Sequence, residues 1–84
     1  MPVLSQFYGI LIKMYFQKME HNPPHFHAFY GEYEAEYNII SGRRLEGRLP
    51  RRADRLVRLW MDLHRQELLE IWETQKFKKI EPLE

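Results

Sequence analysis

The chain has 84 residues, no cysteine and a formal net charge of +1, so we expect one domain over residues 1–84 that buries about 60% of its unfolded surface. The lack of cysteine excludes disulfides, cysteine nucleophiles and thiolate metal sites, and fits a reducing cytosol. The first residues do not have the pattern of a signal peptide, and no apolar run approaches the roughly 20 residues of a membrane span. We therefore expect a cytoplasmic protein that does not insert into a membrane.

The first half of the sequence alternates apolar and polar residues, as antiparallel strands with one solvated face do. This alternation predicts strands over residues 9–16, 25–30 and 33–40, and a short fourth strand over residues 44–49. The segment 17–24 is polar and ends in Pro23-Pro24, which predicts a loop. Gly31-Glu32 and Ser41-Gly42 predict tight connections between the later strands.

A helix is expected to begin at Pro50, where the missing N–H has no cost, and to end at residues 76–79. The apolar stripe of this helix is predicted to contain Ala53, Leu56, Val57, Trp60 and Leu63. Glu67 falls in the middle of that stripe, so the helix should bend near residues 64–67 or present residues 68–72 to a second surface, such as a partner. The predicted fold is α+β, with an antiparallel meander of three to four strands and a C-terminal helix, bent or split, on one face.

Three histidines, His21, His25 and His27, lie within seven residues. Because strand side chains alternate, His25 and His27 should project from the same face. Three imidazoles would suit Zn²⁺ or another borderline transition metal, with one position left for water. Alternatively, His25 or His27 acts as a general acid or base in phosphodiester cleavage. A third interpretation is structural, in which the rings hydrogen-bond the proline loop.

The arginines are concentrated in one part of the sequence. Between residues 43 and 58 there are seven arginines against two acidic residues. Such a stripe is typical of a phosphate-binding surface or of a docking face for an acidic partner, and it also occurs on a solvated helix face. The residues are Arg43, Arg44, Arg48, Arg51, Arg52, Arg55 and Arg58.

The segment from His21 to Ala28, His-Asn-Pro-Pro-His-Phe-His-Ala, is the most specific of several that the chain shares with a known family. Others are Phe7-Tyr8-Gly9-Ile10, Leu45-Glu46-Gly47, Leu49-Pro50 and Leu63-His64-Arg65. Through them the chain closely resembles the short bacterial proteins catalogued as domain of unknown function 4160. It departs from them at Pro50-Arg51, where the relatives tend to carry Pro-Pro.

The resemblance implies no settled activity. Members of this family look like one half of two-gene modules, often beside a small protein catalogued as domain of unknown function 2442, an arrangement similar to a toxin–antitoxin pair. The resemblance thus implies a partner protein and a role directed at translation or RNA.

Our leading expectation is a toxin-like or partner component of such a module. It would bind a partner protein and RNA through the histidine cluster and the arginine stripe, with His25 and His27 as the candidate catalytic pair. One alternative is a non-enzymatic protein-interaction adaptor with structural histidines. A further alternative is a metal-dependent hydrolase or nuclease, with His21, His25 and His27 as ligands of a divalent metal such as Zn²⁺.

Overall fold

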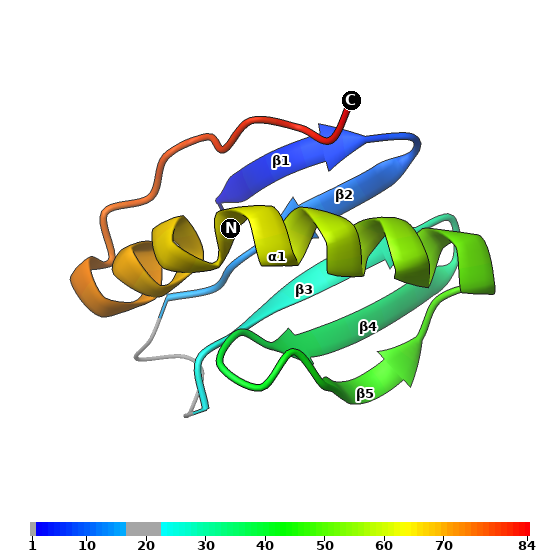
Figure 1. Ribbon diagram of the computed structural model, residues 1–84, viewed down its shortest axis with the longest axis horizontal. Coiled ribbons are helices and arrows are strands. Elements are labelled where there is room, and N and C mark those ends of the chain that lie inside the picture. The colour runs from blue at the N-terminus through cyan, green and yellow to red at the C-terminus, as the bar shows by residue number, and fades with distance from the viewer. Residues whose placement is uncertain (1, 17–22) are drawn as a thin grey trace.

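The structure, a computed structural model that describes residues 2–16 and 23–84, has an α+β fold. A five-stranded antiparallel sheet is covered on one face by a single long helix (Figure 1). The elements are β1 (Val3–Phe7), β2 (Ile10–Lys13), β3 (His25–Tyr30), β4 (Tyr33–Asn38), β5 (Arg44–Arg48) and α1 (Arg51–Thr74). The predicted class is confirmed, with one strand more than expected. Most of the predicted loop over residues 17–24 lies outside the described residues.

The five strands follow one another in the sheet in chain order, each antiparallel to the next. Two-residue turns join two of the pairs. Tyr8 and Gly9 both have positive φ, of 47° and 81°, as a type I′ hairpin turn requires. In the β3–β4 turn, Gly31 supplies a positive φ of 59° at the first turn position. That turn sets the register of β3 on β4 and places His27 opposite Glu36.

Strand β1 was not among the predicted strands, because its burial does not alternate. Leu4 and Ser5 are adjacent and both buried, since the pairing with β2 shifts between Val3 and Ser5. Such a bulge places two successive side chains on nearly the same side and removes the period-two signal. Strand β2 is also shorter than the strand predicted over residues 9–16.

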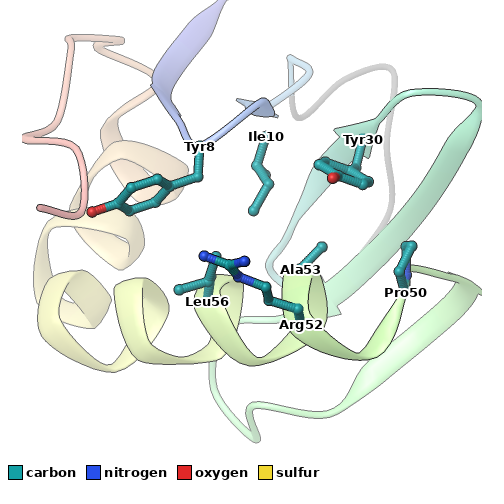
Figure 2. Close-up of a pocket in the computed structure, with 7 residues that line it drawn as sticks. All are labelled: Tyr8, Ile10, Tyr30, Pro50, Arg52, Ala53 and Leu56. Atoms are coloured by element: carbon teal, nitrogen blue, oxygen red, sulfur yellow. The ribbon is translucent and has the colours of Figure 1, made fainter.

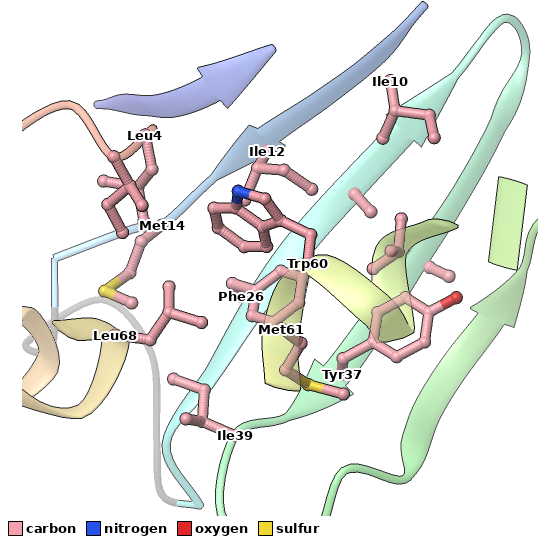
Figure 3. Packing of buried hydrophobic residues seen from close by; sticks show 14 of the residues in the cluster. Leu4, Ile10, Ile12, Met14, Phe26, Tyr37, Ile39, Trp60, Met61 and Leu68 are labelled. Atoms are coloured by element: carbon pink, nitrogen blue, oxygen red, sulfur yellow. The ribbon is translucent and has the colours of Figure 1, made fainter. Parts of the chain in front are cut away.

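The core lies between the sheet and α1. Trp60 is fully buried and its ring lies 5.6 Å from that of Phe7 and 5.7 Å from that of Phe26, centroid to centroid. Figure 3 shows the indole beside Ile12 and Phe26. Its Nε1 donates a hydrogen bond of 2.9 Å to the carbonyl of Glu81. One helical side chain thus joins the sheet, the helix and the C-terminal tail.

The predicted apolar stripe of the helix was wrong at Leu63, which is 70% exposed, and Leu56 is only partly buried. The buried helix residues are Ala53, Val57, Trp60, Met61, Leu68, Ile71 and Trp72. These positions keep one phase along the helix, with a local kink at His64 (φ −119°, ψ 19°). The expected bend is therefore present, but residues 68 and 72 pack into the protein's own core. The helix ends at Thr74, earlier than predicted.

The first turns of α1 are tied to the sheet by a polar contact beside the core. The hydroxyl of Tyr37 donates to Oδ1 of Asp54 at 2.5 Å, and Arg58 donates to Oδ2 at 2.9 Å. Burial, with the Asp54 hydrogen bond, raises the pKa of Tyr37. Burial also opposes ionisation of Asp54, but the hydrogen bonds from Tyr37 and Arg58 outweigh it and lower the pKa of that carboxyl.

The C-terminal tail returns alongside β1 (Figure 1). The amide of Ile80 donates to the carbonyl of Leu4 at 2.7 Å, and the Ile80 side chain is 3% exposed. The tail therefore closes the core at that edge of the sheet. Among the described residues, no helix is both long enough and apolar enough to cross a membrane.

Candidate functional site

Strand β3 places His25 and His27 on the sheet face opposite Phe26 and Ala28, which pack into the core under α1. The two imidazole centroids are 5.3 Å apart, so the expected shared face is observed. His25 and His27 are nevertheless only 6% and 7% exposed. A pair of nearly buried imidazoles is accessible to an ion or a small molecule more readily than to a folded RNA.

Each imidazole has its Nδ1 next to an oxygen acceptor. Nδ1 of His25 lies 2.7 Å from the carbonyl oxygen of Pro23, and Nδ1 of His27 lies 3.4 Å from Oε2 of Glu34. A carbonyl oxygen can only accept a hydrogen bond, so Nδ1 of His25 carries a proton. Pro23 therefore determines the tautomer of His25 when the ring is neutral.

Glu36 completes the cluster from the neighbouring strand. Its Oε1 lies 3.7 Å from Nε2 of His25, and its side chain is 26% exposed. One donor atom from each of His25, His27 and Glu36 lies within 4.8 Å of the other two. The sequence alone does not identify Glu36 as a member of the cluster. The two-residue turn at Gly31-Glu32 was the available signal, because it pairs residue 27 with residue 36.

Aromatic rings enclose the two histidines. The ring of Tyr15 meets His27 edge to face at 4.4 Å and 78°, and the ring of Trp72 lies 5.2 Å from that of His25. The indole Nε1 of Trp72 is buried without a hydrogen-bond partner in the described part of the chain. These contacts hold the imidazoles in place and reduce the local dielectric, which strengthens any electrostatic interaction at the cluster.

The other predicted site residues are not gathered at this cluster. His21 lies outside the described residues. The seven arginines are distributed over the β4–β5 connection, β5 and the first two turns of α1. Within residues 2–16 and 23–84, no hydrogen bond or ion pair joins any of them to His25 or His27. The stripe is therefore not bonded directly to the histidine cluster, but Arg48 of β5 pairs with Glu34, the residue that contacts His27.

Arg58 has a structural role. Besides Asp54, it donates to the carbonyl of Gly42 at 2.9 Å, and its guanidinium lies 5.5 Å from the ring centroid of Tyr37. It thereby holds the β4–β5 connection against the helix. Two of its donor groups, Nε and one terminal nitrogen, are thus engaged within the protein.

A cavity of about 270 Å³ lies at the other end of β3 (Figure 2). Tyr8, Ile10 and Tyr30 line it from the sheet, and Arg52 and Leu56 line it from the start of α1. Tyr30 is the last residue of β3 and His25 the first, so about 10 Å of strand separates Tyr30 from His27 and about 16 Å separates it from His25. Among the described residues, no imidazole or carboxylate lines it, so these residues offer no group for acid–base chemistry near neutral pH.

The chain belongs to the family described as domain of unknown function DUF4160, whose model matches residues 9–73. The match contains β2 to β5 and nearly all of α1, together with His25, His27 and Glu36. No curated protein and no solved structure matches the chain significantly.

Proposed function

We propose that this chain is the partner-binding component of a two-protein module of the toxin–antitoxin type. It binds a small co-encoded protein, of the kind catalogued as domain of unknown function 2442, through the solvent-facing side of α1. The exposure of two leucines on that side of the helix is the observation that carries the proposal.

Leu59 and Leu63 are 51% and 70% exposed. They lie four residues apart on α1 and therefore on one face of the helix. Arg52 and Arg55 precede them on the same side of the helix and are also exposed. We call these four residues the outer helix face. In a chain that buries Trp60, Met61 and Leu68 on the opposite side of this helix, two adjacent exposed leucines favour an interface.

The charge of this region indicates the chemistry of the partner. The side chains of five exposed arginines make no hydrogen bond or ion pair with the described residues: Arg43, Arg44, Arg51, Arg52 and Arg55. Their charge is thus available to a ligand. A partner segment that offers carboxylates around an apolar centre would complement both the arginines and the leucines.

Co-purification with the neighbouring gene's product tests this proposal. In a Leu59→Ser/Leu63→Ser variant we expect at least a tenfold loss of affinity without loss of folding, because the removed side chains are exposed. Leu45→Ser is the matched control, since Leu45 is 40% exposed on the edge strand β5. Binding that survives the double substitution and fails with Leu45→Ser would move the interface to the sheet edge and reject the outer helix face.

RNA binding is the second candidate, favoured by the same five exposed arginines. Arginine contacts with phosphate release counterions, so affinity for a single-stranded RNA should fall steeply with salt. Arg51→Gln/Arg55→Gln should weaken binding and reduce the slope of log affinity against log salt by about 0.7 per lost contact. A salt-independent affinity, or none at low salt, would reject this function while leaving the protein partner in place.

A further inference from the structure

We propose that His25, His27 and Glu36 form a binding site for one divalent transition metal ion of the zinc class. The three side chains come from the adjacent strands β3 and β4, and their donor atoms lie within 4.8 Å of one another. The ring of His25 lies 5.2 Å from that of Trp72, so the site adjoins the C-terminal part of α1. None of its three residues belongs to the outer helix face, so its test is independent of partner binding there.

Nε2 of His25 and Oε1 of Glu36 face each other across the two strands. Since Nδ1 of His25 carries a proton that it donates to Pro23, Nε2 of a neutral ring presents a lone pair. That lone pair lies 3.7 Å from a carboxylate oxygen of Glu36. A positive species between these two atoms, either a proton on Nε2 or a metal ion, would make their approach attractive.

The other ring nitrogen of each histidine, Nδ1, also has a neighbour that suits a metal ligand. Histidines that bind metals almost always donate their other ring N–H to a carbonyl or carboxylate, which fixes the tautomer and increases the basicity of the ligand atom. Pro23 takes this position behind His25, at 2.7 Å. Glu34 takes it behind His27, at 3.4 Å. Both histidines thus have the supporting contacts that a metal site requires.

The spacing fits a small ion after a minor closure. Zinc binds imidazole nitrogen and carboxylate oxygen at about 2.1 Å, which separates ligands in a tetrahedron by about 3.4 Å. The 3.7 Å between His25 and Glu36 is already close to this value. The backbone positions are fixed by consecutive hairpin pairs, with His27 directly opposite Glu36, so side-chain rotation alone can complete the site.

Two imidazoles and one carboxylate leave one position of a tetrahedral zinc ion open. Because the Glu36 side chain is more exposed than either histidine, the open position faces solvent on the Glu36 side. A water molecule or a small oxygen ligand is the group that this position would take. The donor set favours Zn²⁺ or Co²⁺ over Mg²⁺ and Ca²⁺, which prefer oxygen ligands.

Titration of tag-free protein with Co²⁺, followed by displacement with Zn²⁺, tests the proposal. We expect a visible absorption band of tetrahedral Co²⁺ that saturates at one equivalent and disappears when Zn²⁺ is added. Zinc in about hundredfold excess over its dissociation constant should raise the melting temperature by about 10–20 °C, since the ion binds only the folded chain.

Three variants separate the site from nonspecific binding. Glu36→Gln removes a ligand and should weaken Co²⁺ binding by at least about tenfold, and Glu34→Gln removes the support of His27 and should weaken it by about 10- to 100-fold. Glu46→Gln is the matched control, because Glu46 lies opposite Glu36 on β5 and its loss removes the same charge. It should change the affinity by less than about threefold.

Absence of the tetrahedral spectrum in the wild-type protein would overturn the proposal. Equal affinities of the wild type and the Glu36→Gln variant would also overturn it. In that case the positive species between His25 and Glu36 is a proton, and the pair is an ordinary ion pair.

Discussion

At the scale of single residues, the candidate site depends on which atoms the backbone holds in place. The carbonyl of Pro23 orients His25, and the pairing of β3 with β4 brings Glu36 to it. The sequence placed the two histidines on one face because strand alternation requires it. It did not identify Glu36, because a residue of the next strand becomes a neighbour only once the register is known.

Gly47 gives the sharpest prediction at this scale. Its φ is +71°, and a Cβ there would lie 2.1 Å from the carbonyl oxygen of Glu34. Gly47→Ala therefore combines backbone strain of about 1–2 kcal/mol with a clash against β4. We expect a loss of more than about 3 kcal/mol in the free energy of unfolding, measured by urea denaturation.

Gly31→Ala is the matched control for this clash. Gly31 also has a positive φ, of +59°, but a Cβ there would meet no atom within 4 Å. Its substitution should cost only the backbone strain, about 1–2 kcal/mol. Equal losses for the two variants would show that β5 does not approach β4 as closely as described.

The contact between Tyr37, Asp54 and Arg58 predicts how stability depends on pH. The pKa of Asp54 is lowered in the folded state from an ordinary value of 3.8. Below that value the unfolded chain binds a proton before the folded chain does. The ionised Asp54 therefore contributes to stability above about pH 4, and this contribution is lost as the pH falls through the folded pKa of Asp54.

The Asp54→Asn variant isolates this contribution. At pH 7 we expect it to be less stable than the wild type, and the difference should shrink as urea denaturation is repeated from pH 5 down to pH 2. The pKa of Tyr37 is raised from 10.0, so the wild type should also lose stability as the pH rises above about 10. A gap between the two proteins that stays constant from pH 5 to pH 2 would contradict the described contact.

At the scale of elements, the strands and the helix could be predicted from periodicity, but their number and phase could not. The bulge in β1 hid one strand, because Leu4 and Ser5 are both buried. In the helix, Leu63 was assigned to the core because it continued the spacing from Trp60. Met61 and Leu68 take that role instead, and a leucine on the surface is chemically indistinguishable from one in the core.

Two leucines of α1 test the corrected phase. Leu68 is fully buried, whereas Leu63 is 70% exposed. Leu68→Ala should lower the free energy of unfolding by about 2–5 kcal/mol through lost burial and a cavity. Leu63→Ala should change it by no more than about 0.5 kcal/mol. Similar effects of the two substitutions in thermal or urea denaturation would support the stripe predicted from the sequence, in which Leu63 belongs to the core.

At the scale of the whole molecule, the C-terminal tail packs against the first strand. The tail after α1 lies against β1 and accepts the hydrogen bond of Trp60. The bond from Ile80 to Leu4 joins two segments that both lie outside the family match at residues 9–73. No element is predicted after the helix, because the tail carries no periodic pattern of apolar residues.

Ile80 tests whether the tail belongs to the core. It is 3% exposed, so Ile80→Ala should lower the free energy of unfolding by about 2–4 kcal/mol. Pro82→Ala, at an exposed position of the same tail, should have little effect. If both variants melt at the wild-type temperature, the tail does not pack on the core.

The separation of the histidine cluster from the outer helix face gives the molecule two independent surfaces. The proposed ligands come from β3 and β4, and the outer helix face exposes leucines and arginines of α1 to solvent. A partner bound at the helix would therefore leave the metal site accessible. An inhibitory partner would have to act through the fold or extend around its edge.

The most direct test of the metal site is a crystal structure of the zinc-loaded, tag-free protein with anomalous scattering measured at the zinc edge. We expect one anomalous peak, bonded to Nε2 of His25, Nε2 of His27 and a carboxylate oxygen of Glu36. A peak only at another pair, such as His64 and Glu67, which lie 2.7 Å apart on the helix, would contradict it. So would zinc-soaked crystals without any peak.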